Sequence, residues 1–425
     1  MKNVIRACSI LLFAVCCSTA MGAEKDLERR ISMKEYTEKM RGGWVGQMAG
    51  VGWGAPTEFK FTGRIVPEDK MPKWNPRLIN QFKQDDLYVE MTFLRSLEVY
   101  GLDISIRQAG IDFANSGYLL WHANKAGRTL LRSGTAPPDS GHPKFNKHAD
   151  DIDYQIEADF SGLIAPGMPN VAIELGEKFG RLMNYGDGLY GGQFVAGMYT
   201  EAFFEKDPGK IVQAGLKCIP SRSQYAECIL DVVNWHKEDP EDWEKTWTKI
   251  NEKYQLNLEY RRGCCVWRKG GINIDAKING AYVVMGLLYG AGDMDKTIII
   301  ATRCGQDSDC NPSSAAGILS TTIGFSNLPE RFVSELDTTR DFSHTSYNFE
   351  KLVKVCENLA RKSVVRAGGR VVKGEGDEEV LVIPRVTPIP GKLEQYWAPG
   401  PIAGSRFTPE EMAKIKKDKD DRGSR

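Results

Sequence analysis

Acidic side chains gather at four predicted helix boundaries, where they are candidate ligands for a divalent cation. Asp85 and Asp86 directly precede an amphipathic segment, and Asp307 and Asp309 alternate in a short turn. Neighbouring carboxylates repel each other unless a cation neutralises them, and hard ions such as Mg²⁺ prefer clustered oxygen ligands. The pair at 85 and 86 has a structural alternative, because aspartates also cap the free N–H groups at the start of a helix.

The turn that contains Asp307 and Asp309 favours metal binding over a structural role. Asn311 is a predicted N-cap residue and Pro312 fits the first position of the next helix, so neither aspartate is needed to start that helix. Alternate aspartates in a tight turn can point both carboxylates at one ion. We therefore expect both aspartates to be metal ligands.

The two other acidic segments are less specific. Glu58 follows a glycine-rich run that Pro56 ends, and its structural alternative is a loop acid after a closely packed helix. The other segment holds Asp153 and continues to a glycine loop at 186–192, whose backbone N–H groups could approach a phosphate or a sugar. His148, which precedes Asp153, is expected to be a surface histidine rather than a ligand.

The elements that must position these residues are mostly helices. Over 27–360, apolar residues recur mainly at helical spacing, and glycines and prolines stand at the expected helix ends. After residue 366 the pattern changes to two short apolar runs around a turn, which indicates a β-hairpin. We expect a helical domain over 24–365, a hairpin extension over 366–403, and a charged tail over 404–425 that is frayed from Pro409 onward.

Composition excludes several classes of protein. The chain has 425 residues, with 56 Lys and Arg against 56 Asp and Glu, so its formal net charge is zero and it has no strong field for nucleic acid. A hydrophobic content of 41% and a charged content of 26% exclude wholesale disorder and a multi-span membrane protein. We expect a monomer with no nucleic-acid partner and no integral membrane segment.

Residues 1–23 have the pattern of a secretory signal peptide. Two basic residues precede a short apolar run and several small residues. The run is too short for a transmembrane span of about 20 residues. We expect export to the periplasm or the cell exterior after cleavage behind Ala20 or Ala23, and lipidation at Cys16 or Cys17 is the less favoured alternative. The remaining cysteines are expected to be scattered buried thiols with at most one disulfide.

Taken together and in this order, the acidic motifs resemble the ADP-ribosylglycohydrolase family over about residues 33–335. The family pattern Gly-Asp-Ala-x-Gly-x-Pro-x-Glu is partly met at 50–58, Thr-Asp-Asp at 84–86, and Gly-Gly-Asp-x-Asp-Thr-Asn at 305–311. The resemblance implies an all-α, orthogonal multi-helix bundle around one or two Mg²⁺ or Mn²⁺ ions. It also implies that the metal ligands are Asp85, Asp86, Asp307 and Asp309, with Glu58 beside them.

Two positions depart from the family pattern. Gln84 and Cys310 stand where the family usually offers the hydroxyl of Thr or Ser as a metal ligand. A glutamine amide oxygen can still bind Mg²⁺, so Gln84 remains a predicted ligand, whereas a thiol is a poor partner for a hard ion. We therefore expect the second ion to bind weakly or to be absent. The loop at 186–192 also lacks the Asn-Gly-x-x-Met-Arg sequence with which the family commonly grips ADP-ribose.

The leading hypothesis is a metal-dependent hydrolase that cleaves an N- or O-glycosidic bond to ADP-ribose or a related sugar. The metal would activate water, Glu58 or an aspartate would act as acid or base, and Asp153 would face the substrate. The residues expected to bind this small sugar or nucleotide-sugar are Asp187, Gly188, Tyr190 and Gly191. Two alternatives stay open: a glycoside hydrolase acting on an imported glycan or glycoside, and an inactive sugar- or nucleotide-binding protein of the same fold.

Overall fold

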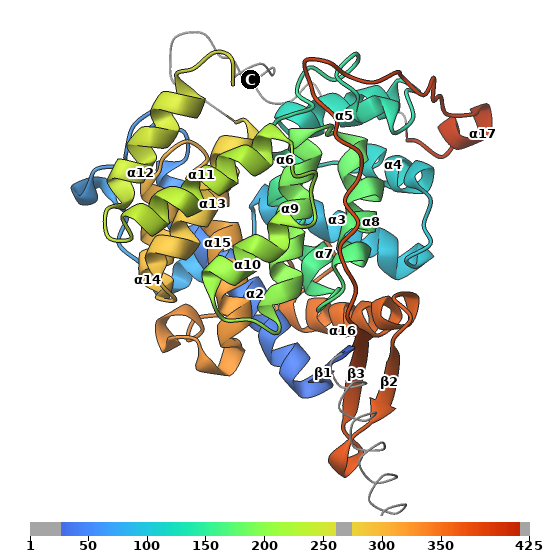
Figure 1. Cartoon of the computed structure of the whole chain (residues 1–425). Coiled ribbons are helices and arrows are strands. Elements are labelled where there is room, and N and C mark those ends of the chain that lie inside the picture. The colour runs from blue at the N-terminus through green and yellow to red at the C-terminus, as the bar shows by residue number, and fades with distance from the viewer. Residues whose placement is uncertain (1–26, 261–273, 417–425) are drawn as a thin grey trace, which may run out of the picture.

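A computed structural model describes residues 27–260 and 274–416, and the predicted signal peptide at 1–23 lies outside these ranges. Helices dominate the described part of the chain, as the sequence predicted (Figure 1). None of these helices combines the length and the apolar character needed to cross a membrane. The α-helices are α2 (Met33–Gly54), α3 (Asp85–Tyr100), α4 (Ile106–Ala114), α5 (His122–Arg132), α6 (Asp153–Ile156), α7 (Asp159–Leu163), α8 (Pro169–Phe179), α9 (Asp187–Ala202), α10 (Pro208–Leu216), α11 (Gln224–Glu238), α12 (Trp243–Ile250), α13 (Ala276–Gly290), α14 (Met294–Arg303), α15 (Cys310–Ile323), α16 (Phe349–Arg366) and α17 (Pro409–Met412).

The core of the bundle is built on the close contact of α2 with α15, both of which carry many small residues. A Cβ atom added to Gly46 would lie 2.3 Å from the carbonyl oxygen of Ala316, and one added to Gly54 would lie 2.1 Å from that of Ser308. Any side chain at these positions would force the two helices apart. The glycines of α2 therefore set how closely α15, and the acidic turn that precedes it, approach the end of α2.

The predicted C-terminal hairpin is present, but it belongs to a three-stranded antiparallel sheet. Strand β2 (Arg370–Lys373) pairs with β3 (Glu379–Pro384), and β1 (Glu28–Ser32) pairs with the other edge of β3. The sheet lies at one end of the molecule next to α16 (Figure 1). The sequence did not reveal β1, because a five-residue strand that lies far from its partner in the chain has too little pattern of its own.

The predicted frayed tail is docked throughout its described part, so that expectation is wrong up to residue 416. Arg107 of α4 forms an ion pair with Glu411, and Thr408 forms a capping box with Glu411 at the start of α17. Phe407 and Ile415 are buried in the core. Two apolar side chains and one paired acid hold this segment, although its local composition is mostly charged.

The cysteines of the described ranges agree with the prediction of scattered thiols. They are all free and buried, and they are Cys218, Cys228, Cys304, Cys310 and Cys356. Two further cysteines of the expected mature chain, Cys264 and Cys265, lie outside the described residues. Burial without a partner thiol makes these side chains part of the core packing.

Candidate metal centre

The structure brings the acids of three separate motifs together between α2, α3 and α15. Carboxylate oxygens of Glu58, Asp307 and Asp309 lie within 4.8 Å of one another, and oxygens of Asp86 and Asp309 lie equally close to the thiol of Cys310. Because Asp309 belongs to both groups, they form one acidic centre. Glu58 is exposed at its edge, whereas Asp86, Asp307 and Asp309 are 0%, 4% and 2% exposed.

Two helix N-termini meet at the acidic centre. Helix α3 begins at Asp85 after the N-cap residue Gln84, and α15 begins at Cys310 after the N-cap residue Asp309. Neither N-cap side chain makes a capping hydrogen bond. The predicted start of α15 at Pro312 is therefore wrong by two residues. The positive ends of both helix dipoles favour negative charge at this point.

Two buried carboxylate oxygens of the acidic centre have no hydrogen-bond partner among the described residues, namely Oδ1 of Asp86 and Oδ1 of Asp307. The thiol of Cys310 donates to Oδ2 of Asp86 at 3.2 Å. Burial and the neighbouring carboxylates raise the pKa of Asp86, Asp307 and Asp309 well above its usual range. Isolated buried charge is costly, and a divalent cation would supply the missing partner. The oxygen-rich donor set therefore fits a hard ion such as Mg²⁺.

The turn that carries Glu58 is tied to the turn that carries Asp307. The backbone N–H of Phe59 donates to the carbonyl of Gln306 at 3.0 Å, and the hydroxyls of Thr57 and Ser308 are 2.7 Å apart. Thr57 and Phe59, the residues on either side of Glu58, make these two contacts and thereby hold Glu58 beside the buried aspartates. Two turns that are far apart in the sequence are thereby joined at one centre.

The carboxyl of Glu58 is set up to hold a proton near neutral pH. Desolvation by the surrounding protein, followed by the charges of Asp309 and Asp85, raises its pKa to about 8. A bound cation would oppose this rise by replacing repulsion with attraction. Glu58 is thus the member of the centre that combines contact with solvent and a perturbed pKa.

Asp85 and Gln84 lie at the edge of the centre. Both are half-buried, and the amide nitrogen of Gln84 donates to the side-chain oxygen of Gln81 at 3.2 Å. Asp85 does not belong to the groups of atoms within 4.8 Å, but its charge contributes to the raised pKa of Asp309. Their roles as ligands stay predictions.

Asp153 has a structural role that the sequence analysis missed. Its two oxygens accept the backbone N–H groups of Ala123 and Asn124 at 3.1 and 2.9 Å, so it caps the start of α5. Burial, reinforced by the charge of Asp151, raises the pKa of Asp153 to about 8. Both oxygens are engaged, which leaves its predicted catalytic role without support in these contacts.

The predicted glycine loop at 186–192 is wrong, because residues from Asp187 onward form α9. A Cβ atom on Gly188 would lie 2.5 Å from the carbonyl oxygen of Ala149, and one on Gly191 would lie 2.5 Å from the side-chain oxygen of Gln155. Both glycines therefore allow close packing of α9 against the 149–155 segment. They present no open cradle to a ligand, and this packing accounts for them.

Asp187 and Tyr190, the other two predicted substrate-binding residues, also have partners within the protein. Asp187 accepts the backbone N–H of Tyr225 at 3.2 Å, in the first turn of α11. The hydroxyl of Tyr190 donates to the carbonyl of Lys392 at 2.8 Å. The segment at 385–403, which runs back from the sheet across the helices in Figure 1, is fastened there. The substrate-binding roles of both residues stay predictions without a supporting contact.

Sequence reasoning missed a second acidic group one turn along α3. Glu90 accepts hydrogen bonds from the amide of Gln47 at 2.6 Å and from the backbone N–H of Phe160 at 2.8 Å. Asp159 accepts from the same amide at 3.0 Å and from the hydroxyl of Tyr199 at 2.9 Å. The available signal was the position of Glu90, four residues after Asp86 on the apolar face of a predicted helix.

The match to a family model agrees with the motifs that meet in the acidic centre. The family model described as ADP-ribosylglycohydrolase matches residues 32–367. A solved structure, the "ADP-ribosylglycohydrolase-related protein complex", is similar with a TM-score of 0.48 and 14% sequence identity, over 78% of this chain and 99% of that one. No curated protein matches the chain. Since the family model covers well over half of the sequence, the chain belongs to the ADP-ribosylglycohydrolase family.

Proposed function

We propose that the protein is a metal-dependent hydrolase that cleaves an N- or O-glycosidic bond to ADP-ribose or a related sugar. The observation that carries the proposal is the buried acidic centre beside the exposed Glu58. In this centre one oxygen each of Asp86 and Asp307 has no donor among the residues that the structure describes, and Asp309 lies next to them. Membership of a family named for glycohydrolases supports the reaction class. The substrate would be a small sugar or nucleotide-sugar conjugate.

Asp86, Asp307 and Asp309 would hold one firmly bound cation, Mg²⁺ or Mn²⁺, with Asp85 and Gln84 as further candidate ligands. Their oxygen atoms suit a hard ion, whereas the thiol of Cys310 disfavours a second one. When bound, the cation would neutralise the centre, polarise sugar hydroxyls and lower the pKa of a coordinated water.

Glu58 would move the proton of the reaction. Burial and the neighbouring carboxylates raise the pKa of Glu58 to about 8 without a cation, and a bound cation would lower it from that value. A carboxyl whose pKa lies between its ordinary value and about 8 can donate a proton to a departing oxygen or nitrogen and then accept one from water. Its exposure at the edge of the centre gives a substrate access to it. We assign it the role of general acid and base.

Export is part of the proposal. The leader-like segment at 1–23 supports secretion to the periplasm or the cell exterior. A substrate in that compartment would be an exported or imported sugar conjugate. A glycoside hydrolase therefore stays the second candidate function. Cys310, whose thiol contacts Asp86 where a hydroxyl ligand is usual, favours the third candidate, a binding protein without turnover.

The test uses the chain from residue 24 onward, stripped of metal and then supplied with Mg²⁺ or Mn²⁺. Release of free sugar is measured from ADP-ribosyl-arginine, ADP-ribosyl-serine and a panel of glycosides, with Asp309→Asn as the matched control. We expect release of ADP-ribose that EDTA and the variant abolish. Release of sugar from glycosides alone would favour the second candidate, a glycoside hydrolase. Metal binding without release from any compound would favour the third candidate, a binding protein without turnover. Failure to bind either ion by calorimetry would contradict the whole proposal.

A further inference from the structure

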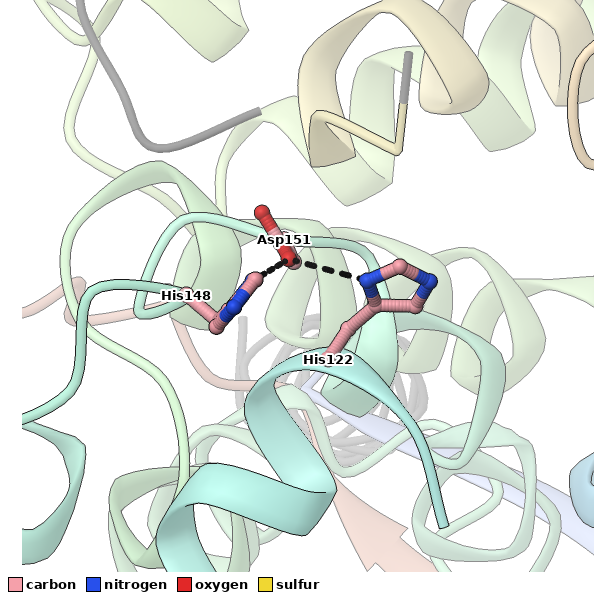
Figure 2. A group of neighbouring side chains, drawn as sticks. All are labelled: His122, His148 and Asp151. Atoms are coloured by element: carbon pink, nitrogen blue, oxygen red, sulfur yellow. Dashed lines mark hydrogen bonds and ion pairs between the residues drawn. The ribbon is translucent and has the colours of Figure 1, made fainter. Parts of the chain in front are cut away.

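Two histidines and an aspartate form a compact cluster at the start of α5 (Figure 2). Nδ1 of His148 lies 2.7 Å from Oδ2 of Asp151, and Nδ1 of His122 lies 3.7 Å from the same oxygen. One ligand atom from each residue lies within 4.8 Å of the others. The side chain of His148, expected at the surface, is 32% exposed and lies against a fully buried carboxylate.

The cluster joins two segments of chain that other contacts already hold in place. The capping of α5 by Asp153 fixes the start of that helix against the segment that carries Asp151. The side chain of Asn146 accepts the backbone N–H of His148 at 2.9 Å, which fixes the other histidine. The three side chains are thus positioned by contacts independent of the cluster, as expected of a preorganised site.

The backbone of His122 adds a second indication. Its φ is +39°, in the left-handed region that non-glycine residues rarely adopt. Such a conformation is energetically costly and persists only where the surrounding structure enforces it, and such residues cluster at active sites, ligand-binding positions and switch regions. Figure 2 shows the imidazole of His122 beside the carboxylate of Asp151.

We propose that His122, His148 and Asp151 form a metal site for a borderline transition ion of the Zn²⁺ class, separate from the acidic centre. Two imidazoles and one carboxylate are the ligand set of three-residue Zn²⁺ sites, which leave a fourth position open. Ligand atoms around such an ion lie about 3.3 Å apart, as follows from metal–ligand distances of roughly 2.0–2.1 Å. The separations in the cluster need only small side-chain rotations to match.

The donor atoms also separate this site from the acidic centre chemically. Imidazole nitrogen binds Zn²⁺ well and Mg²⁺ poorly, whereas the acidic centre offers mainly oxygen. The two sites are nevertheless neighbours, because Ile152 and Ile156, which follow Asp151, pack with Cys310 and Phe59. An ion bound by the histidines would fix the segment that borders the acidic centre and leave its open position to water or to a polar group of a ligand.

The test titrates Co²⁺, a coloured substitute for Zn²⁺, into the metal-stripped full mature chain in the presence of excess Mg²⁺ to occupy the acidic centre. The readouts are the visible absorption of the bound Co²⁺ and calorimetry with Zn²⁺. The site variants are His122→Asn, which tolerates the positive φ of this position, and His148→Gln. The controls are Asp309→Asn and His236→Gln, the latter at a histidine that packs edge-on against Tyr289 away from the cluster.

We expect one equivalent of Co²⁺ with the intense absorption of four-coordinate geometry. Each site variant should weaken binding at least about tenfold, since each removes a ligand, while both controls should bind as the unchanged chain does. Binding that is unaffected in both site variants, or no binding by the unchanged chain, would overturn the proposal. Because the two histidines lie on separate segments, misfolding of one variant, seen as a lowered melting temperature without metal, leaves the other variant as the test.

Discussion

Two groups of buried carboxylates meet α3 one helical turn apart, at Glu90 and at Asp86, and they differ in what surrounds them. In the first, Glu90 and Asp159 have all four of their oxygens accepting hydrogen bonds from the protein. In the second, Asp86 and Asp307 each keep a buried oxygen without a partner in the described part of the chain. Helix α3 therefore carries one acid of each kind, Glu90 with both oxygens satisfied and Asp86 with one oxygen left open.

The difference separates structural acids from candidate functional ones. A buried carboxylate that is fully hydrogen-bonded stabilises the arrangement of its donors, and removing it leaves those donors unsatisfied. A buried carboxylate without donors destabilises the folded chain unless a proton or a cation joins it. We therefore expect substitutions in the two groups to respond in opposite ways to added metal.

The largest effect is expected from Asp309→Asn, because Asp309 belongs to both sets of converging atoms in the acidic centre. Loss of this charge should lower kcat/KM on the substrate on the order of 10³-fold, since a catalytic cation contributes several kcal/mol. The same variant should melt above the unchanged chain in EDTA, because less repulsion remains. Kinetics and calorimetric melting with and without Mg²⁺ test both halves. An unchanged affinity for Mg²⁺ in this variant would show that Asp309 is not a ligand of the ion.

Glu90→Ala should destabilise the protein by about 2–3 kcal/mol with or without Mg²⁺, because the N–H of Phe160 and one contact of Gln47 lose their acceptor. Urea unfolding in EDTA and in Mg²⁺ measures this. The exposed Arg95 on the same helix provides the control, and Arg95→Ala should change stability by no more than about 0.5 kcal/mol. A loss of stability that Mg²⁺ reverses would place Glu90 in the metal-binding group instead.

The pH dependence of stability provides an independent test of the hydrogen-bonded group, through Asp159. Burial raises the pKa of Asp159 to about 7, above a value near 3.9 for the unfolded chain. Between these values the folded state holds a proton that the unfolded state releases, so the free energy of unfolding falls as pH rises from about 4 to 7. The slope from this group is at most about 1.4 kcal/mol per pH unit. Asp159→Asn should flatten the slope in EDTA, and an unchanged slope would assign the dependence to other groups.

The smallest effect is expected from Cys310→Thr. A hydroxyl in place of the thiol offers an oxygen to the ion beside Asp86 and Asp309, so Mg²⁺ should bind roughly fivefold more tightly. Calorimetric titration measures the change, with the buried Cys356, which lies outside the metal-ligand groups, as the site of a matched control, Cys356→Ser. Equal affinity in Cys310→Thr and the unchanged chain would show that this position does not contact the ion.

Local pattern was enough to predict the helices, the hairpin strands and the acids at 58, 86, 307 and 309 that the structure brings together. Helical periodicity and acid-rich helix starts depend on residues only a few positions apart, so they are visible in the chain. The glycines at 188 and 191 were misread for the same reason. Their local spacing fits a loop, and only the close approach of the 149–155 segment identifies them as packing residues of α9.

The sequence by itself determined the family, the helical class and which acids belong to the shared motifs. Tertiary structure alone decided which buried carboxylates have donors, that Asp153 caps a helix thirty residues earlier, and that His122 and His148 meet at Asp151. The physical reason is distance along the chain. Whether a charge is satisfied depends on partners brought near by folding, and such partners leave no mark on the local pattern of residues.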